Sequence, residues 1–455
     1  MVKYILILAI SLITFFNTPP DYSWKLNTFA LALFILLFLF LYKDSKDKNQ
    51  FNFNILFSIS FLFTSFIYPV FFFLTNTYDI PFFVYGFNKE VINKSTMIAL
   101  IGYNLYCIGA FNALKTKRKF TFKNKKYYNK INILIVYILF FLFLSQVGAL
   151  NLLKSDYGGT NTWGGISRYI FFILIAFLWV TVIIELNNKQ EQTIIRTILK
   201  MNKWLLCLIL LYCSFFLIVG NRANILSLLI IIVGYLTMHV RKMNTKVLSL
   251  IILTGFFLLS LLSLFRINKD NLSEDIWRNR SGSAQSILSL GSDLMISNYT
   301  LYLLVDDANM NGYTYGHTMV GPILGVFPFM MSSYINISGD KEENLTSSLY
   351  ITEKTLGNQD VGLGTNIVGD LYLSFGLPGV CIGLYLLGLF VNRMRIYAST
   401  RKLSYNIVYL IMLSWSIMLP RAEYFVYLRG LTWAIGVFLI ISTFHNIRIR
   451  QKFHL

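Results

Sequence analysis

The chain has 455 residues, of which 56% are hydrophobic, 16% are aromatic and only 13% are charged. Soluble domains carry about 25% charged residues, so this composition excludes an ordinary soluble protein. The formal net charge of +19 could indicate binding to nucleic acid. Most of the positive charge, however, lies in short segments between long apolar runs, where membrane topology requires it. Nucleic acid is therefore not an expected partner.

Apolar runs long enough to cross a bilayer recur along the whole chain. The runs are continuously apolar rather than alternating, which favours helices over a β-barrel. We therefore predict an all-α polytopic integral membrane protein with about 12 transmembrane helices. The expected spans are 4–17, 26–42, 54–75, 95–114, 131–147, 166–186, 204–220, 223–240, 247–265, 367–391, 404–420 and 424–444.

The first run, Tyr4–Phe16, follows Lys3 and resembles a signal sequence. No small-residue cleavage site follows it, and Asn17–Pro20 is typical of a tight turn, so we expect an uncleaved helix. The four cysteines lie inside apolar runs without metal-ligand spacing. They are expected to be small buried hydrophobic residues: Cys107, Cys207, Cys213 and Cys381.

The distribution of Lys and Arg predicts the orientation. If the N-terminus is cytoplasmic, every strongly basic segment between spans falls on the cytoplasmic side, and the C-terminus is cytoplasmic too. With Lys3, these segments hold most of the 40 basic residues, and they are 43–48, 115–130, 187–203, 241–246, 392–402 and 448–452.

The opposite face would carry one dominant segment, residues 266–366, which is too long for a simple connection. The expected organisation is nine helices in 1–265, this large extracytoplasmic loop, and three helices in 367–455. Within the loop, 283–305 is predicted to be helical. Residues 312–334 are apolar but interrupted by Gly and Pro, which predicts a re-entrant or interfacial segment.

Arginines gather on the expected outer face, several of them at span ends. A guanidinium at the membrane boundary costs free energy that an anion can offset, and its rigid fork suits phosphate. Snorkelling to lipid headgroups explains any single one equally well. If 421–429 is one helix, Arg421 and Arg429 lie about 12 Å apart along its axis, a spacing that suits a diphosphate and its sugar. The candidate diphosphate-binding residues are Arg222, Arg266, Arg278, Arg280, Arg421 and Arg429.

Few side chains on the expected outer face can transfer a proton. His317 is the only histidine there and could accept a proton from a sugar hydroxyl near neutral pH, so it is the first candidate base. Asp370 begins the tenth expected span, and Glu423 follows Arg421 by two residues. Either carboxylate is a candidate catalytic group or a counter-ion of the arginines.

No P-loop, HExxH or GxSxG motif occurs, and no cofactor or metal site is predicted. Asp306 and Asp307 could form a metal-binding pair, but a solvated helix end is the favoured interpretation. Any chemistry is therefore expected on the outer face, on a substrate that is already activated.

Three stretches resemble the Wzy-type O-antigen polymerases, the oligosaccharide repeat-unit polymerases. They are GNRANILSLLIIIVGYL (220–236), YTYGHTMVGPILGVFPFM (313–330) and GLGTNIVGDLYLSFGLPGVCIGLYLLGL (362–389). The first is similar to an arginine-bearing outer turn and its helix, the second to a G-x-T segment of the large loop, and the third to a span with an acidic residue before FG-x-x-G. Family members often carry Glu where this chain has Asp370, and a fixed-spacing glycine of their arginine loops is not cleanly present.

The resemblance implies a metal-independent, GT-C-like glycosyltransferase without cofactors. It would polymerise undecaprenyl-diphosphate-linked oligosaccharide units into O-antigen, capsule or exopolysaccharide at the outer face of the bacterial plasma membrane. Outer arginines would stabilise the departing diphosphate. The implied partners are the lipid-linked oligosaccharide and membrane lipids, with a flippase and a chain-length regulator as further candidates.

Two other functions stay open at this point. An O-antigen ligase-like transferase would use the same kind of donor but needs a different acceptor, whereas a polymerase makes a ladder from one repeat unit alone. A flippase or transporter would place ionisable residues near the middle of its spans, along a path. In this chain the ionisable residues instead gather towards one side of the membrane.

Overall fold

The structure is a computed structural model. It describes residues 1–45, 49–75, 83, 86–115, 127, 129–148, 165–189, 191–219, 221–249, 287–357 and 362–453. Within these ranges the regular structure is entirely helical, with no β-strand, which confirms the all-α prediction.

The helices fall into three groups along the chain. The N-terminal group is α1 (Val2–Phe16), α2 (Trp24–Ser45), α3 (Phe53–Leu62), the π-turn η1 (Phe63–Ile67), α4 (Tyr68–Thr75), α5 (Val91–Lys115), α6 (Lys130–Val147), α8 (Ile166–Asn188), α9 (Ile194–Leu199), α10 (Lys203–Val219) and α11 (Arg222–His239). The middle group is α14 (Ile287–Asn311), η4 (His317–Met319), α15 (Val320–Leu324), α16 (Met330–Ser338), η5 (Glu342–Leu345) and α17 (Ser347–Leu356). The C-terminal group is α18 (Ile367–Ala398), α19 (Leu403–Trp415), η6 (Leu419–Arg421) and α20 (Tyr427–Phe453).

Seven described helical segments are long and apolar enough to cross a membrane, as an integral membrane protein requires. They are Trp24–Ser45, Phe53–Phe71, Val91–Lys115, Lys130–Val147, Ile166–Asn188, Ile367–Ala398 and Tyr427–Asn446. Shorter apolar helices occupy further expected spans, at Val2–Phe16, Lys203–Leu217, Ala223–His239 and Leu403–Trp415. Of the expected span 247–265, only the first three residues are described, so the total of 12 spans stays a prediction.

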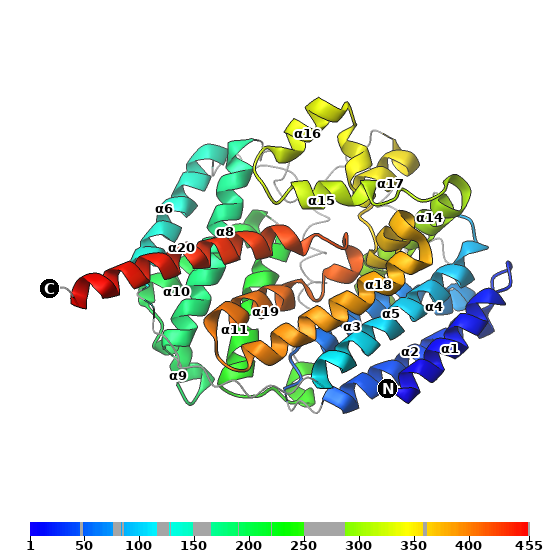
Figure 1. Cartoon of the computed structure of the whole chain (residues 1–455), viewed down its shortest axis with the longest axis horizontal. Coiled ribbons are helices and arrows are strands. Elements are labelled where there is room, and N and C mark those ends of the chain that lie inside the picture. The colour runs from blue at the N-terminus through cyan, green and yellow to red at the C-terminus, as the bar shows by residue number, and fades with distance from the viewer. Residues whose placement is uncertain are drawn as a thin grey trace.

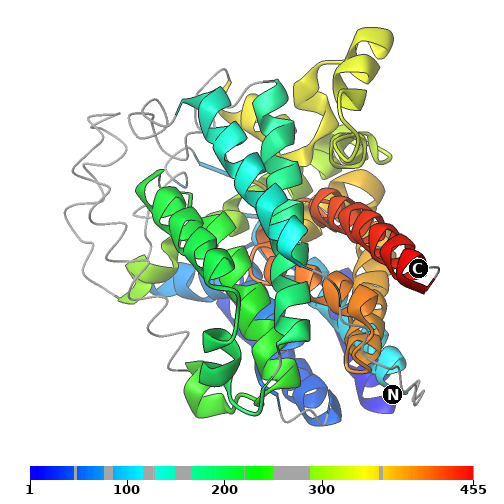
Figure 2. The ribbon, with the colours of Figure 1, turned by 90° about the vertical axis from the view of Figure 1, so that its left-hand side faces the viewer.

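The short helices α15, α16 and α17 lie together beyond one end of the long helices (Figures 1 and 2). They come from the segment in which the sequence predicts an interrupted apolar stretch at 312–334. That stretch forms η4 and α15, which follow each other directly, and then the first half of α16 after an interruption at 325–329, with no spanning helix. The helix expected at 283–305 is α14, which ends six residues later than predicted, at Asn311.

The helices α5 and α18 run side by side, and glycine permits their close approach (Figure 1). A Cβ atom on Gly109 of α5 would strike the Tyr385 carbonyl of α18. A Cβ atom on Gly388 of α18 would strike the Tyr106 carbonyl of α5. Because lipid tails are as apolar as leucine, membrane helices gain stability from such close backbone packing rather than from hydrophobic exclusion.

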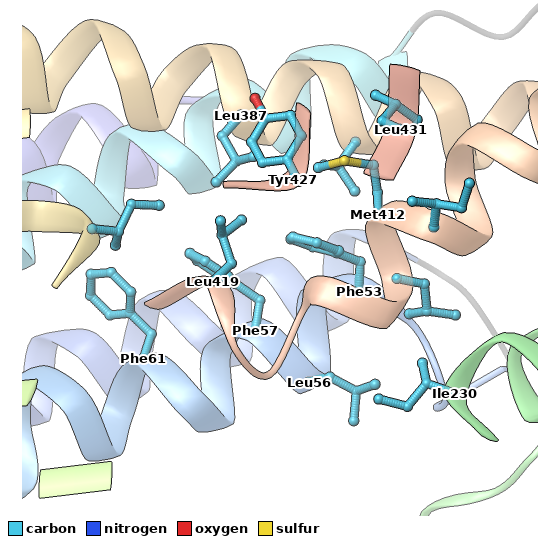
Figure 3. Packing of buried hydrophobic residues seen from close by; sticks show 14 of the residues in the cluster. Phe53, Leu56, Phe57, Phe61, Ile230, Leu387, Met412, Leu419, Tyr427 and Leu431 are labelled. Atoms are coloured by element: carbon cyan, nitrogen blue, oxygen red, sulfur yellow. The ribbon is translucent and has the colours of Figure 1, made fainter. Parts of the chain in front are cut away.

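The connection between α19 and α20 packs on α3. Figure 3 shows Leu419 of η6 among the aromatic side chains of α3, including Phe57 and Phe61, and all three are fully buried. The Ser60 hydroxyl donates a hydrogen bond of 2.5 Å to the Ile417 carbonyl. These contacts hold the connection against a rigid span, and the connection carries Arg421 and Glu423.

The π-turn η1 interrupts the span formed by α3 and α4. A π-turn shifts the helical hydrogen-bond pattern and leaves carbonyls that need other donors. The Asn298 side-chain amide donates to the Phe63 carbonyl at 2.9 Å, and the Asn366 side-chain amide donates to the Thr64 carbonyl at 3.1 Å. Two buried amides thereby join α14 and the start of α18 to this span.

The α5–α18 contact can be tested with Gly388→Ala. The added methyl group would meet backbone atoms of α5 that cannot rotate away, so we expect a loss of about 1–3 kcal/mol in stability, read as a lower unfolding temperature in detergent. Gly436→Ala in α20 is the matched control, because a Cβ atom there meets nothing within 4 Å. Equal unfolding temperatures for both variants would contradict the contact.

Candidate functional site

The helix α18 is broken near its start. Gly376 has φ 65° and ψ −156°, a conformation that favours glycine, and Pro378 has no backbone N–H to donate. The Thr314 backbone N–H donates to the Leu373 carbonyl, just before the break, at 2.9 Å. The loop at the end of α14 therefore docks on this break and brings two of the family-like stretches into contact.

Asp370 lies in the first turn of α18 and is fully buried. Its Oδ2 accepts a hydrogen bond of 2.8 Å from the Tyr424 backbone N–H. The Ser347 side chain at the start of α17 faces the same carboxyl and also hydrogen-bonds Thr365 at 3.0 Å. The Asp370 carboxyl thus joins α18, α17 and the connection before α20.

Glu423 precedes Tyr424, so the bond to Asp370 also determines where the Glu423 side chain begins. Glu423 is half-buried. Burial raises the pKa of its carboxyl to about 7, and the neighbouring Asp370 carboxyl shifts the pKa in the same direction. The Ser348 backbone N–H, the Arg429 guanidinium and the Thr346 side chain oppose this rise. A carboxyl with such a pKa can take up or release a proton near neutral pH.

Arg429 lies in the first turn of α20, and its guanidinium is held in place. Its Nε donates to the Gly325 carbonyl at 2.6 Å, and its Cζ lies 4.6 Å from the centre of the Phe172 ring. One turn later, the Trp433 Nε1 donates to the Val326 carbonyl at 2.7 Å. The Nη atoms of Arg429 remain available to other partners. The negative charge of Glu423 attracts the guanidinium.

A glycine face of α15 covers this cluster. Gly321 packs so closely on Thr346 that a Cβ atom would lie 2.5 Å from the Thr346 methyl group. Gly325 caps α15 four residues later, on the same side of the helix, and a Cβ atom there would overlap Nη2 of Arg429. The space occupied by the guanidinium therefore exists only because residue 325 has no side chain.

The first turn of α8 completes the surroundings of Arg429. The Arg168 guanidinium is close enough to repel that of Arg429 electrostatically, and Arg168 itself is exposed. The Tyr169 hydroxyl accepts a hydrogen bond of 2.8 Å from the Phe329 backbone N–H, which holds the segment after α15 against α8. Two guanidinium groups of like charge near each other favour an anion between them.

His317 lies in η4, directly before α15, and is partly exposed. Its Nε2 lies 3.8 Å from Oδ2 of Asp340, which follows α16. A carboxylate at this distance can orient the imidazole ring. No hydrogen bond or ion pair joins His317 to Glu423 or Arg429 in the described part of the chain.

The other predicted arginines are placed less completely. Arg421 ends η6, and Ala422 is extended, so 421–429 is not one helix and the 12 Å spacing along a helix axis is wrong. Arg222 begins α11, but its side chain lies outside the described residues, as do Arg266, Arg278 and Arg280.

The interpretation of Asp307 as part of a solvated helix end is wrong. Asp307 is buried and accepts hydrogen bonds from Asn311 at 2.7 Å and from the Tyr350 hydroxyl at 2.8 Å, and it forms an ion pair with Lys354. Asp307 therefore ties α14 to α17. Within the described ranges, no group of three or more His, Cys, Asp and Glu side chains is placed to hold a metal ion.

Reasoning from the sequence missed the residues that hold Arg429. The Gly325 and Val326 carbonyls lie in the family-like stretch 313–330, but nothing in that stretch indicates that its backbone binds Arg429. The Phe172 ring comes from another distant segment. Two weak signals were present in hindsight. Arg429 and Trp433 are four residues apart on one helix face, and so are Gly321 and Gly325.

A family model described as "O-antigen polysaccharide polymerase Wzy" matches residues 1–452 of this chain. The match covers nearly the whole chain and confirms the resemblance of the three stretches. No curated protein and no solved structure gives a significant match.

The role of Asp307 can be tested by comparing the stability of an Asp307→Ala variant with that of an Asp306→Ala variant. Asp307→Ala removes the acceptor of three side chains and leaves the Tyr350 hydroxyl and the Lys354 ammonium only the 3.4 Å hydrogen bond between them. We expect a loss of about 1–3 kcal/mol in stability, measured as a lower unfolding temperature. Asp306→Ala, which removes only an exposed hydrogen bond with Asn88, should change that temperature little. A larger effect of Asp306→Ala would refute the assignment.

Proposed function

The chain belongs to the family of O-antigen polysaccharide polymerases Wzy and polymerises saccharide repeat units, and we propose that these units arrive on undecaprenyl diphosphate at the outer face of the bacterial plasma membrane. In this proposal both termini are cytoplasmic, and residues 266–366 form the extracytoplasmic loop of a GT-C-like enzyme. The basic segments between spans support this orientation.

The observation that carries the proposal is the placement of Arg429. Its Nε is occupied by the Gly325 carbonyl, so the fork has a defined direction, and its Nη edge shares a cluster with Glu423. Glycosyl transfer from a lipid diphosphate releases a diphosphate whose negative charge must be stabilised. A guanidinium that is oriented before the reaction stabilises this charge without reorganisation and without a metal ion.

Further arginines would complete the diphosphate site. Arg168 lies within electrostatic range of Arg429, and Arg421 is half-buried at the end of η6, eight residues before Arg429. We assign the same function to the predicted residues whose side chains are not described: Arg222, Arg266, Arg278 and Arg280.

His317 is the proposed base. It would take the proton of the acceptor hydroxyl while that oxygen bonds to the anomeric carbon of the donor sugar. The bond between this carbon and the diphosphate oxygen breaks, and its electron pair leaves with the diphosphate. Asp340 would orient the imidazole. Asp370, fully buried and bonded to Tyr424, acts as a positioning residue for Glu423.

The proposed partners follow from this reaction. The donor and the acceptor are both lipid-linked repeat units, so a flippase would deliver them, and a chain-length regulator would act on the product. The lipid tails would lie along the apolar helices. Exposed side chains such as Ile138, Phe141 and Leu439 provide such surfaces.

The diphosphate site can be tested with Arg429→Ala. We expect a strain that carries only this variant to make one repeat unit and no long chains, because the departing charge is no longer stabilised. Loss of one such donor costs about 100- to 1,000-fold in rate. Gly325→Ala should give the same defect, since its methyl group displaces the guanidinium.

Gly362→Ala is the matched control for Gly325→Ala, because a Cβ atom at Gly362 meets nothing within 4 Å. All variants are compared at equal protein levels in the membrane. The purified protein should also build a ladder from one lipid-linked repeat unit alone. Long chains in Arg429→Ala, or a requirement for a second acceptor, would contradict the proposal.

The role of His317 is tested separately by substitution. His317→Ala should slow polymerisation by about 100-fold or more at equal protein levels in the membrane, because the proposed base is gone. Asp340→Asn should slow it less, because the base remains and only the partner that orients the imidazole is lost. A wild-type rate in His317→Ala would exclude this residue as the base.

A further inference from the structure

We infer that three exposed aromatic side chains at the break in α18 form a saccharide-binding surface, on which a sugar ring of the repeat unit or of the growing chain rests. The three side chains are Tyr313, Tyr315 and Phe375, and we call them the aromatic ledge. The inference depends on the polymerisation of saccharide units, but neither on the diphosphate site at Arg429 nor on His317 as the base.

The loop after α14 brings Tyr313 to the break in α18. The Thr314 backbone N–H donates to the Leu373 carbonyl at 2.9 Å, which fixes the loop beside the break. Directly before this bond, the Tyr313 ring fills the space at Gly376, where a Cβ atom would lie 2.7 Å from Cζ of Tyr313. Residue 376 therefore has to lack a side chain for the ring to fit, and Tyr313 is still 41% exposed.

Phe375 and Tyr315 extend the aromatic ledge. A Cβ atom on Gly316 would lie 2.8 Å from Cζ of Phe375, so this ring lies against the loop, and Phe375 is 46% exposed. Tyr315 directly precedes Gly316, is 79% exposed and has a φ of 50°. A non-glycine residue in the left-handed region is strained, and such strain concentrates at functional sites. Within the described residues, no hydrogen bond or ring contact of Tyr315 accounts for this conformation.

Hydrogen-bond donors lie at the edge of the aromatic ledge. Tyr372 packs edge-to-face on Tyr313, with 5.9 Å between the ring centres, and its hydroxyl donates to Oδ1 of Asn309 at 3.2 Å. The Lys94 ammonium donates to the same oxygen at 2.7 Å. Because both partners are donors, the NH2 group of the exposed Asn309 side chain can donate to a ligand. No acceptor for this NH2 group occurs in the part of the chain that the structure describes.

Aromatic rings beside hydrogen-bond donors suit a saccharide. A sugar ring carries C–H groups that pack on the negative face of an aromatic ring, and its hydroxyl groups need hydrogen-bond partners. The aromatic ledge supplies the rings, and Asn309 and Lys94 supply donors.

Lipid headgroups are the other class of ligand that attracts tyrosines to a membrane boundary. A tyrosine that only contacts headgroups needs no strained backbone. The strain at Tyr315 and the amide group of Asn309 therefore favour a saccharide, which is the class of compound that this family polymerises.

The test is saturation-transfer NMR on the full chain in lipid nanodiscs. The probe is the oligosaccharide of one repeat unit, which partial acid hydrolysis of the strain's own polysaccharide releases without lipid or phosphate. We expect transfer to this probe above the background of empty nanodiscs. Tyr315→Ala should weaken binding by about tenfold, because one aromatic contact is lost. Tyr315→Phe keeps the ring and should bind like the wild type.

Asn309→Ala should also weaken binding, because the donor at the edge of the ledge is lost, and it decides the question if Tyr315→Ala does not accumulate. Tyr42→Ala is the matched control, because it removes an exposed tyrosine in α2, outside the ledge, and it should bind the probe like the wild type.

A wild type that gives no transfer above the background would overturn the inference. Equal affinity in Tyr315→Ala and Asn309→Ala would overturn it as well and assign the ledge to lipid headgroups. Arg429→Ala should bind this phosphate-free probe like the wild type, so either failure leaves the proposed diphosphate site intact. Long chains made by Arg429→Ala would instead overturn that site and leave the aromatic ledge unaffected.

Discussion

The hydrogen bond from the Tyr424 backbone N–H to the Asp370 carboxyl is the interaction on which the candidate site depends. It joins the first turn of α18 to the connection before α20, two segments that are far apart in the chain. Together with the hydrogen bond from Ser60 to the Ile417 carbonyl, it positions the backbone of Glu423. An Asp buried at this place is costly unless it is hydrogen-bonded, and the Tyr424 backbone N–H offsets part of that cost.

Interrupted helices are the second constraint. A membrane protein must satisfy every backbone group internally, so each break in a helix needs a donor or acceptor from elsewhere. The π-turn η1 receives the amides of Asn298 and Asn366, and the break in α18 receives the backbone N–H of Thr314. Each break is therefore also a junction. The breaks bring α14, its following loop and α18 together, and the site lies beside this junction.

The glycine face of α15, which covers the candidate site, affects both the packing of the site and the position of its guanidinium. Gly321 and Gly325 leave room for Thr346 and for the Arg429 guanidinium, and the Gly325 carbonyl orients that guanidinium.

The sequence by itself determined that this is a helical membrane protein, where most spans lie and which family it belongs to. Apolar runs are local and continuous, so they survive in any tertiary arrangement. Arg429, Asp370 and Glu423 could be named as candidates because charge is rare in such a chain. Only the tertiary structure decided that these three lie together, that Arg421 does not continue into the helix of Arg429, and that Asp307 is buried. These outcomes depend on contacts between distant segments and on carbonyl groups and glycines, whose sequence signal is too weak to read in advance.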